Sequence, residues 1–248
     1  MRSNNRNPKQ TALILGASKR IGKALSIHLA SQGWNIALHY NLSAEPAKQL
    51  QEQLQQKYPE NQFETLRANL MDQTEVQQLI SSVLTKFHSL DLLINNASVF
   101  EPSSIRETSV ELLERQMIIN FQSPFLLCRD FAKSTKKGLI INLTDTRITS
   151  NRSNYAAYSL SKKALWELTK MAALEFAPGI RVNAIAPGLT LAPADKNENY
   201  LLTLAKEIPM KKPGGLTPIL QSLDYIIKNE YLTGQLLFAD GGENLGKN

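Results

Sequence analysis

The sequence contains only one cysteine and three histidines among 248 residues, and it has no apolar run of about eighteen residues. Cys128 has no second cysteine to pair with, so an intramolecular disulfide is excluded. Its place in an apolar helical stretch predicts a small core residue in a reducing compartment, and we expect a cytoplasmic protein. The histidines and Cys128 lack the spacing of metal ligands, so no metal site is expected. Without a long apolar run, no membrane-spanning helix is expected either.

The charge of the chain favours small anions over nucleic acid. The formal net charge is +6, but the basic residues are dispersed along the chain. A mild positive field of this kind favours ligands such as nucleotide phosphates, and we expect no nucleic-acid partner. Residues 1–10 are polar and basic without an apolar signal core, so they are expected to form a flexible tail. Residues 11–248 contain no linker, repeat or low-complexity run and are expected to form one α/β domain.

Short apolar runs alternate with longer stretches of helical character along residues 11–248. This alternation indicates βαβ crossovers, and therefore a Rossmann-type doubly wound parallel sheet of about seven strands with helices on both faces. The expected strands are Thr11–Leu15, Trp34–Tyr40, Phe63–Ala68, Asp91–Asn95, Gly138–Leu143, Ile180–Ile185 and Gln235–Ala239. The expected helices are Ile21–Ser31, Ala44–Lys57, Gln73–Phe87, Ser109–Lys133 and Asn154–Ala177.

Three local features of these elements can also be predicted. Asp72 is expected to be the N-cap of a helix, with Glu75 three residues on completing a capping box. Pro124 lies inside the expected helix Ser109–Lys133, where a proline breaks or kinks the backbone. The stretch Leu189–Pro218 is rich in Pro, Gly, Lys and Asn, which suits a mobile substrate lid.

The turn after the first strand predicts a phosphate site. Gly16 and Gly22 enclose it, and a helix follows, so backbone N–H groups and a positive helix terminus meet there. A site that selects NAD usually carries an acid at the end of the second strand, whereas residues 41–43 contain none. Because Lys19 and Arg20 stand in the phosphate turn, the missing acid favours a 2′-phosphate and hence NADP.

Tyr158 and Lys162 form a second chemical pattern. They are four residues apart in an expected helix, so their side chains share a face. A fixed cation beside a phenol lowers the phenol pKa toward working pH, and the pair therefore predicts a proton donor. Asp145 comes at the end of an expected strand. Because ligands of parallel sheets bind beyond the carboxyl ends of the strands, Asp145 is expected at the same edge as the phosphate turn.

The order of these motifs resembles the short-chain dehydrogenase/reductase family from about Thr11 to Gly242. The family marks are Gly16-(x5)-Gly22, Asn95-Asn96-Ala97, Asn120, Tyr158-(x3)-Lys162 and Pro187-Gly188. Within the family, the chain is most similar to the pteridine reductases and the related dihydromonapterin reductases. The features that carry this similarity are Lys19-Arg20, His39-Tyr40-Asn41-Leu42-Ser43, Asn95-Asn96-Ala97-Ser98-Val99-Phe100, and Asp145 in place of the usual catalytic serine.

The resemblance implies NADPH-dependent hydride transfer to a pterin ring, with Asp145, Tyr158 and Lys162 as a proton relay. The implied catalytic set also includes Asn120, and Phe100 would stack on the pterin. The implied substrate residues are Arg20, Ser98, Phe100, Asp145, Tyr158 and Leu189. The implied cofactor contacts are Gly16, Lys19, Arg20, Ile21, Tyr40, Asn41, Leu42, Ser43, Asn69, Leu70, Asn96, Ala97, Ser98, Lys162, Pro187 and Gly188. A homotetramer is implied as well, with helices Ser109–Lys133 and Asn154–Ala177 between subunits.

Asp145 separates pterin from ketone chemistry by its charge. A carboxylate repels the developing alkoxide of a ketone, whereas it accepts the N–H and amino donors of a pterin. Three alternatives stay open: a carbonyl reductase of 3-oxoacyl or other ketones, an NADP-binding scaffold without turnover, and a structural Asp145 whose role has passed to Thr144. The same residues do not separate dihydrobiopterin, dihydromonapterin and dihydrofolate as substrates.

Three positions depart from the family pattern. Leu15 replaces a threonine that braces the turn, and Asn69 replaces an aspartate that accepts from adenine. The amide oxygen of Asn69 keeps an acceptor at that place. Leu42 stands where some pteridine reductases have a base for the 2′-phosphate. The expected NADP preference therefore depends on Arg20, Ser43 and backbone donors.

Overall fold

A seven-stranded parallel sheet organises the computed structural model, which describes residues 9–193 and 196–245. The expected flexible tail lies almost wholly outside these residues. The strand order is β3-β2-β1-β4-β5-β6-β7, and every neighbouring pair is parallel. The strands are β1 (Thr11–Ile14), β2 (Asn35–Tyr40), β3 (Phe63–Arg67), β4 (Leu92–Asn95), β5 (Gly138–Leu143), β6 (Ile180–Pro187) and β7 (Leu236–Ala239). This arrangement confirms the predicted Rossmann-type fold.

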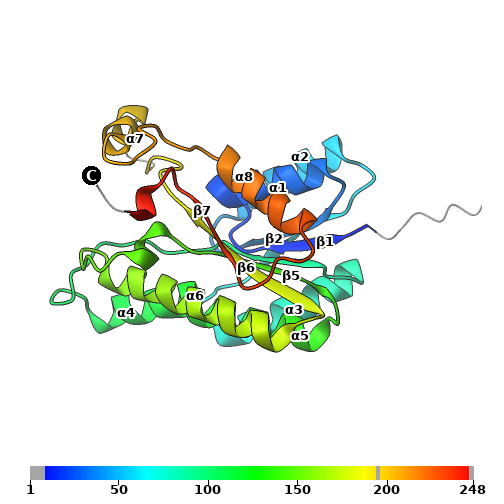
Figure 1. The fold of residues 1–248 in the computed structure, drawn as a ribbon. Coiled ribbons are helices and arrows are strands. Elements are labelled where there is room, and N and C mark those ends of the chain that lie inside the picture. The colour runs from blue at the N-terminus through cyan, green and yellow to red at the C-terminus, as the bar shows by residue number, and fades with distance from the viewer. Residues whose placement is uncertain (1–8, 194–195, 246–248) are drawn as a thin grey trace, which may run out of the picture.

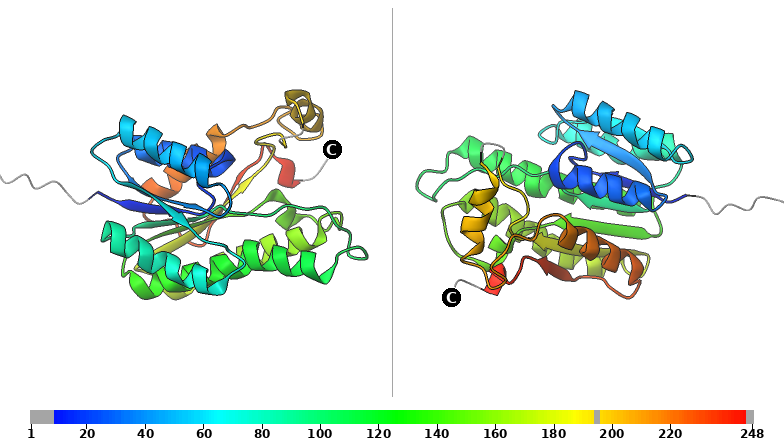
Figure 2. Two further views of the ribbon diagram at one scale, coloured as in Figure 1. Left: turned by 180° about the vertical axis from the view of Figure 1, so that it is seen from behind. Right: turned by 90° about the horizontal axis from the view of Figure 1, so that it is seen from above.

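Helices cover both faces of the sheet (Figures 1 and 2). One layer is formed by α1 (Arg20–Ser31), α2 (Ala44–Lys57) and α8 (Thr217–Lys228). The other contains α3 (Gln73–Phe87), α4 (Val110–Met117), α5 (Ser123–Ser134) and α6 (Ala156–Phe176). Each layer buries its own apolar cluster against the sheet, which is the reason that the strands read as continuous apolar runs.

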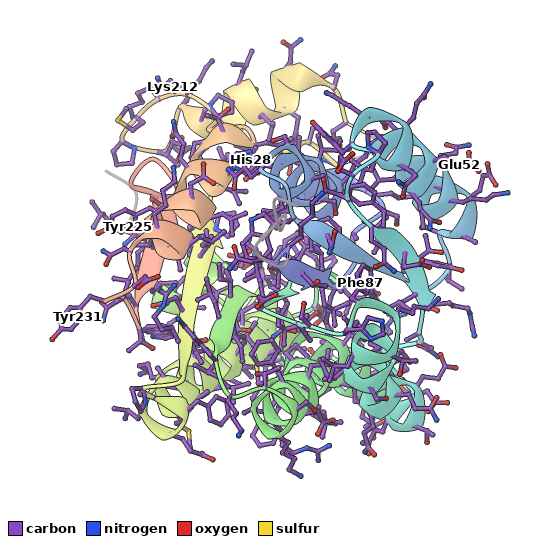
Figure 3. All side chains as sticks on the ribbon, turned by 90° about the vertical axis from the view of Figure 1, so that its right-hand side faces the viewer. His28, Glu52, Phe87, Lys212, Tyr225 and Tyr231 are labelled. Atoms are coloured by element: carbon purple, nitrogen blue, oxygen red, sulfur yellow. The ribbon has the colours of Figure 1, made fainter. Side chains whose placement is uncertain are left out.

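The two outer helices α1 and α8 are joined by a polar contact as well as by apolar packing. His28 of α1 lies beside α8 (Figure 3), and its Nε2 is 2.8 Å from Asp224 Oδ1. Gln32, one turn further along α1, donates to the same carboxylate oxygen. His28 and Gln32 together tie α1, which follows the phosphate turn, to α8, which comes from the far end of the chain.

The expected helix Ser109–Lys133 is continuous but changes its hydrogen-bond register. A π-helical segment, Ile118–Gln122, joins α4 to α5, and the N–H of Ser123 bonds to the carbonyl of Ile118. Pro124 then falls at the start of α5. The wider turn places the missing N–H of Pro124 at a helix start, where proline is tolerated. The expected break or kink at Pro124 is therefore replaced by a π turn.

The predicted capping box of α3 is half correct. Asp72 Oδ1 accepts from the N–H groups of Thr74 and Glu75, which confirms the N-cap. Glu75 Oε2 accepts from Asn69 N rather than from Asp72 N, because Asp72 N already donates to the carbonyl of Asn69. The carboxylate thus braces the loop at the end of β3 instead of closing the box.

Within the predicted lid, the described residues 189–193 and 196–218 are more structured than their composition indicated. They contain α7 (Glu198–Ala205), and α8 begins within their last two residues. Figure 1 shows α7 apart from both helical layers and close to the short 3-10 helix Glu243–Leu245. The order of the strands reverses between β1 and β4, so the crevice for a ligand lies at the carboxyl ends of these central strands.

Candidate active site

The predicted face shared by Tyr158 and Lys162 is present on α6. Both side chains are buried, and the Lys162 ammonium lies 5.8 Å from the centroid of the Tyr158 ring. Lys162 Nζ donates to the carbonyl of Leu143 at 2.8 Å. The end of β5 therefore fixes the ammonium beneath the phenol, and the spacing of four residues predicted this correctly.

Asp145 completes a pair with Tyr158. The Tyr158 hydroxyl donates to Asp145 Oδ2 at 2.8 Å, while Asp145 Oδ1 accepts from Arg147 N at 2.8 Å. Asp145 thus caps the short 3-10 helix Thr146–Thr149 and also reaches the phenol. The Thr144 hydroxyl is buried and bonds to the carbonyl of Ile185, so it is directed away from the pair. The geometry gives no support to the alternative in which Thr144 replaces Asp145.

The expected lowering of the Tyr158 pKa is wrong. Burial raises the pKa of Tyr158 well above its ordinary value, and the charge and hydrogen bond of Asp145 raise it further. The charge of Arg147 and a hydrogen bond with Ser98 oppose this rise without cancelling it. Burial also lowers the pKa of Lys162 to about 8, with Asp145 acting in the opposite direction. Tyr158 is therefore a protonated hydroxyl at neutral pH.

Asn120 is a buried organiser of the loop after β4. Its Oδ1 accepts from Val99 N at 2.9 Å and from Ser98 Oγ at 3.1 Å. Its amide donates to the carbonyl of Val99, to Gln116 Oε1 and to Ser161 Oγ. The side chain lies in the π segment, which points it at this loop. Asn120 therefore positions Ser98, whose hydroxyl reaches Tyr158, and does not itself line the cavity described below.

Phe100 belongs to an aromatic group that the sequence analysis did not anticipate. Its ring stacks on Tyr155 with centroids 4.3 Å apart and an angle of 5°, and it meets the Tyr158 ring edge-on at 4.6 Å. The guanidinium of Arg147 lies 4.3 Å from the centroid of Tyr155 and 5.8 Å from that of Phe100. Phe100 is still 52% exposed, so part of its ring surface is open to a ligand.

The turn between β1 and α1 approaches the loop after β4 closely. Gly16 has a φ of +65°, and a Cβ at Gly22 would lie 2.1 Å from the Gly16 oxygen. Asn96 donates its amide to the carbonyl of Leu15 at 2.8 Å, and Ala97 packs against Gly16. Helix α1 then starts with no side-chain cap and no acid in its first turn. Its first N–H groups are therefore available to an anion.

His39 braces the same turn from β2. Its Nδ1 accepts from Gly16 N at 3.0 Å, and its Nε2 lies 3.1 Å from the carbonyl of Ala68. Burial lowers the pKa of His39 to about 4, so the imidazole is neutral and Nε2 carries the proton. The sequence showed His39 only as part of a motif, because its partners come from two other strands.

Arg20 connects the phosphate turn to the predicted lid. Its backbone φ is +51°, which is unusual for a residue other than glycine. Its guanidinium donates to the carbonyls of Leu191 and Ala192 at 3.1 and 3.0 Å. The neighbouring Lys19 is exposed at the N-cap of α1, and Ile21 packs on the apolar cluster below it. The turn and the lid are thus linked across the crevice.

The ends of β2 and β3 lie side by side. Asn41 Nδ2 and Met71 N both donate to Asn69 Oδ1, at 3.4 and 3.1 Å, so this oxygen already has two donors. Leu42 is 90% exposed, and Ser43 is the N-cap residue of α2 but forms no side-chain cap. The other predicted residues here are Tyr40, which ends β2, and buried Leu70, whose carbonyl accepts from Ser123.

A cavity of about 500 Å³ opens beside the Asp145–Tyr158 pair. Of the predicted residues, Phe100, Asp145, Pro187, Gly188 and Leu189 line it, whereas Ser98, Tyr158 and Arg20 stand outside its wall. Helix α7 and the loop before it close another side. The lining residues that the sequence analysis missed include Arg147, Arg152, Tyr155, Tyr200 and Leu204. Tyr155 is three residues before Tyr158, a spacing that would have indicated a shared side.

Two negative findings apply to the described ranges 9–193 and 196–245. Within them no three His, Cys, Asp or Glu side chains gather in a way that could hold a metal ion. In the same ranges, no helix is both long enough and apolar enough to cross a bilayer. Cys128 is buried, and burial raises its thiol pKa to about 12, which fits the predicted core role.

Known proteins resemble this chain over nearly its whole length. A 3-oxoacyl-[acyl-carrier-protein] reductase, FabG, of Staphylococcus epidermidis is 31% identical over 244 residues, covering 94% of this chain and 98% of the relative. A glucose 1-dehydrogenase of Gluconobacter oxydans is 30% identical over 245 residues, covering 94% and 91%.

Two solved structures share this fold and are named for a different activity. FolM alternative dihydrofolate reductase 1 from Brucella canis, complexed with NADP, has a TM-score of 0.91 and 29% identity, covering 97% of this chain and 96% of that one. The corresponding protein of Brucella suis, also with NADP, has a TM-score of 0.91 and 28% identity, with 98% of each chain covered. The family model described as short chain dehydrogenase matches residues 10–200. With the parallel sheet, the glycine turn and the Tyr158–Lys162 pair in place, the chain belongs to the short chain dehydrogenase family of oxidoreductases.

Proposed function

We propose that the protein is an NADPH-dependent reductase that transfers hydride to a pterin ring, converting a dihydropterin into a tetrahydropterin. The observation that carries this proposal is the 2.8 Å contact between the Tyr158 hydroxyl and the Asp145 carboxylate. A carboxylate here is an acceptor for the N–H and amino groups of a pterin and holds the phenol as a proton donor. The likeness to the FolM alternative dihydrofolate reductases supports the same assignment.

The residues of the crevice fit NADPH. The tight turn leaves no room for a side chain at Gly22, and the uncapped start of α1 offers N–H groups to the diphosphate. At the end of β2, residues 39–43 carry no acid, and the Ser43 hydroxyl makes no cap bond. Ser43, together with Lys19 and Arg20 of the turn, would bind the 2′-phosphate. The missing acid removes the repulsion that would otherwise exclude it.

NADPH, when bound, supplies the hydride for C6 of the C6=N5 bond in a 7,8-dihydropterin. The chain supplies the proton for N5. Tyr158 retains its proton because of burial and of Asp145, so its hydroxyl is available as the proton donor beside that carboxylate. When the phenol gives up this proton, the ammonium of Lys162 stabilises the phenolate. Asp145 orients the hydroxyl and accepts from the pterin, and the open surface of Phe100 binds the planar ring.

A second candidate is a carbonyl reductase, which the 31% identity to the 3-oxoacyl reductase FabG favours. This reaction needs neutral donors around the carbonyl oxygen, because negative charge develops on it. Asp145 would place a carboxylate beside that charge, and Thr144 does not compensate because it bonds to Ile185. We therefore place pterin reduction first.

Absorbance-monitored oxidation of NADPH tests the two candidates directly. The purified protein is given 7,8-dihydrobiopterin, 7,8-dihydromonapterin, 7,8-dihydrofolate or a small 3-ketoacyl ester, one at a time. Turnover of dihydropterins without turnover of the ester is the expected result. Turnover of the ester alone would show that the protein is a ketone reductase and would overturn the pterin proposal.

A further inference from the structure

His39 lies near the end of β2 and holds the loops that follow the strands on either side of it. The sheet places β2 between β3 and β1, so one side chain of β2 can reach partners in both directions. Toward β1, its Nδ1 accepts from Gly16 N at 3.0 Å, and its backbone carbonyl accepts from Ala17 N at 2.9 Å. Toward β3, its Nε2 lies 3.1 Å from the carbonyl of Ala68.

The two ring contacts require one form of the imidazole. Nδ1 faces an N–H donor and therefore carries no proton, whereas Nε2 faces a carbonyl and carries one. His39 is only 2% exposed, so bulk water does not replace either partner. A buried donor without an acceptor is costly, and the Gly16 N–H would become such a donor if Nδ1 were removed. The ring therefore fixes the orientation of the Gly16 amide.

The bonds to His39 divide the N–H groups of the predicted phosphate turn into two sets. Those of Gly16 and Ala17 are held by His39. Those of the next set, Arg20, Ile21 and Gly22, open α1 and find no acceptor within the described part of the chain, as is usual at a helix start. A Cβ at Gly22 would lie 2.1 Å from the Gly16 oxygen, so the two backbones are in tight contact. The position of the free donors therefore depends on how Gly16 is held.

The contact toward β3 concerns the opposite end of the proposed cofactor site. Ala68 is held by β2 through both of its backbone groups, because its N–H donates to the carbonyl of Tyr40 at 3.0 Å and its carbonyl accepts from His39. Asn69, which is expected to face the adenine, follows directly. His39 thus connects the residues expected at the diphosphate with the residue expected at the adenine.

We infer that His39 is a positioning residue for the nicotinamide cofactor, because its ring holds the phosphate turn and the loop after β3 in the arrangement that the adenosine diphosphate half requires. It acts through Gly16 and Ala68. The inference rests on the proposed use of NADPH and does not depend on which substrate is reduced. Loss of the Nδ1 contact should therefore weaken the binding of NADPH more than loss of the Nε2 contact does.

Two substitutions separate the contacts of the ring. His39→Asn places an amide oxygen close to the position of Nδ1 and keeps an acceptor for Gly16 N. His39→Gln reaches the position of Nε2 and keeps a donor for the carbonyl of Ala68, but it leaves the Gly16 N–H without its acceptor. The Kd of NADPH, measured by fluorescence titration, is expected to rise about tenfold in His39→Gln and to stay close to the wild-type value in His39→Asn. Thermal melting verifies that both variants fold.

The outcomes distinguish this inference from the proposed function. Equal Kd values in the wild type and His39→Gln would overturn the inference and leave the proposed function intact, as would an equal rise in both variants. Nitrogen-15 NMR of the wild-type protein tests the same point without a variant: His39 should carry its proton on Nε2 at pH 7, and the opposite tautomer would overturn the inference. A wild-type protein that binds no NADPH would overturn both.

Discussion

The Tyr158 hydroxyl donates a hydrogen bond to Asp145, and this contact favours the protonated form of the phenol. The phenol is buried and faces a carboxylate, so its pKa is raised and the hydroxyl stays protonated. Lys162 is held below by the carbonyl of Leu143 and takes no part in that hydrogen bond. Charge balance around Tyr158 therefore depends on Lys162 from beneath and on Arg147 from the cavity side.

Replacement of the Asp145 carboxylate is expected to affect the rate of reduction without affecting the binding of NADPH. Asp145→Ser is expected to lower kcat for a dihydropterin by about 100-fold or more, because the acceptor that orients Tyr158 and meets the pterin is lost. The dissociation constant of NADPH, measured by fluorescence, should change little, since the phosphate turn lies on other elements. A comparable loss of NADPH binding would mean that Asp145 is structural.

The lowered pKa of Lys162 predicts a fall in kcat/KM on the alkaline side of its pH profile. Burial lowers its pKa to about 8, so the side chain is charged below this pH and neutral above it. We expect kcat/KM to fall as the pH rises through about 8, because a neutral amine no longer stabilises the phenolate. Lys162→Arg keeps its charge at all these pH values and should flatten this limb while lowering the absolute rate. A wild-type profile that stays level to pH 10 would contradict the role given to Lys162.

His39 predicts the acid sensitivity of the fold. Its pKa is lowered from 6.5 to about 4 in the folded protein, so the unfolded chain binds the extra proton first. The contribution of neutral His39 to the free energy of unfolding is therefore fully present above pH 6.5. It is lost as the pH falls toward 4, and the loss amounts to about 3 kcal/mol in total. Urea unfolding between pH 7.5 and pH 4 measures this loss. His39→Gln should be less stable at pH 7.5, and the difference from the wild type should shrink at pH 4.

At the residue scale, the spacing along the sequence predicted pairs of residues that lie on one helix or strand. It missed pairs whose members come from different elements. Tyr158 and Lys162 were found because one helix carries both. Tyr155 shares the start of that helix, but its role became visible only when Phe100 stacked on it from another loop. The direction of the Tyr158 pKa was predicted wrongly, because burial depends on the whole fold and outweighs one cation.

At the scale of elements, strands were easier to predict than helices near the site. Strands of a parallel sheet are covered on both faces, so they appear as short apolar runs between turns. The segment around α7 contains glycine, proline and lysine, and its helix was missed because it packs beside a cavity rather than on the sheet. The π turn before Pro124 was missed for another reason, since a single proline does not reveal which register the preceding turn adopts.

The link between Arg20 and the loop before α7 gives an element-scale prediction. Its guanidinium bonds to the carbonyls of Leu191 and Ala192, and its backbone has a φ that suits glycine. Arg20→Gly should therefore keep the fold while removing the link to the predicted lid. We expect faster amide exchange in residues 189–193 and a higher KM for NADPH, measured by hydrogen–deuterium exchange and kinetics. Lys19→Ala is the control for exchange; equal exchange in wild type and Arg20→Gly would contradict the link.

At the scale of the whole molecule, each group of the site comes from a different strand end. The predicted phosphate turn follows β1, the residues proposed to bind a 2′-phosphate follow β2, the loop of Phe100 follows β4, and Asp145 follows β5. Helix α6, which carries Tyr158 and Lys162, lies in the lower layer of Figure 1, and its far side is not covered by the sheet. Any change in how α6 packs is therefore transmitted to Tyr158 and Lys162, which are rigidly part of it.

The outer surface of α5 and α6 is the place where we propose that subunits meet. Met171 and Leu174 of α6 are 66% and 84% exposed, and Phe125 of α5 is also exposed. A groove of about 420 Å³ lies between the two helices, and Phe125 and Met171 are among the residues that line it. Apolar surface of this kind, exposed on a single chain, marks a protein interface.

We expect a homotetramer, with a mass near 111 kDa for four chains of 27.7 kDa. A Met171→Glu and Leu174→Glu double variant should dissociate it into dimers or monomers, because burying two unpaired carboxylates at an interface is costly. Size-exclusion chromatography with light scattering measures the mass. Tyr231→Glu is the control, since Tyr231 is fully exposed on another part of the surface. A wild-type mass of one chain, or a double variant that stays tetrameric, would show that this surface is not the interface.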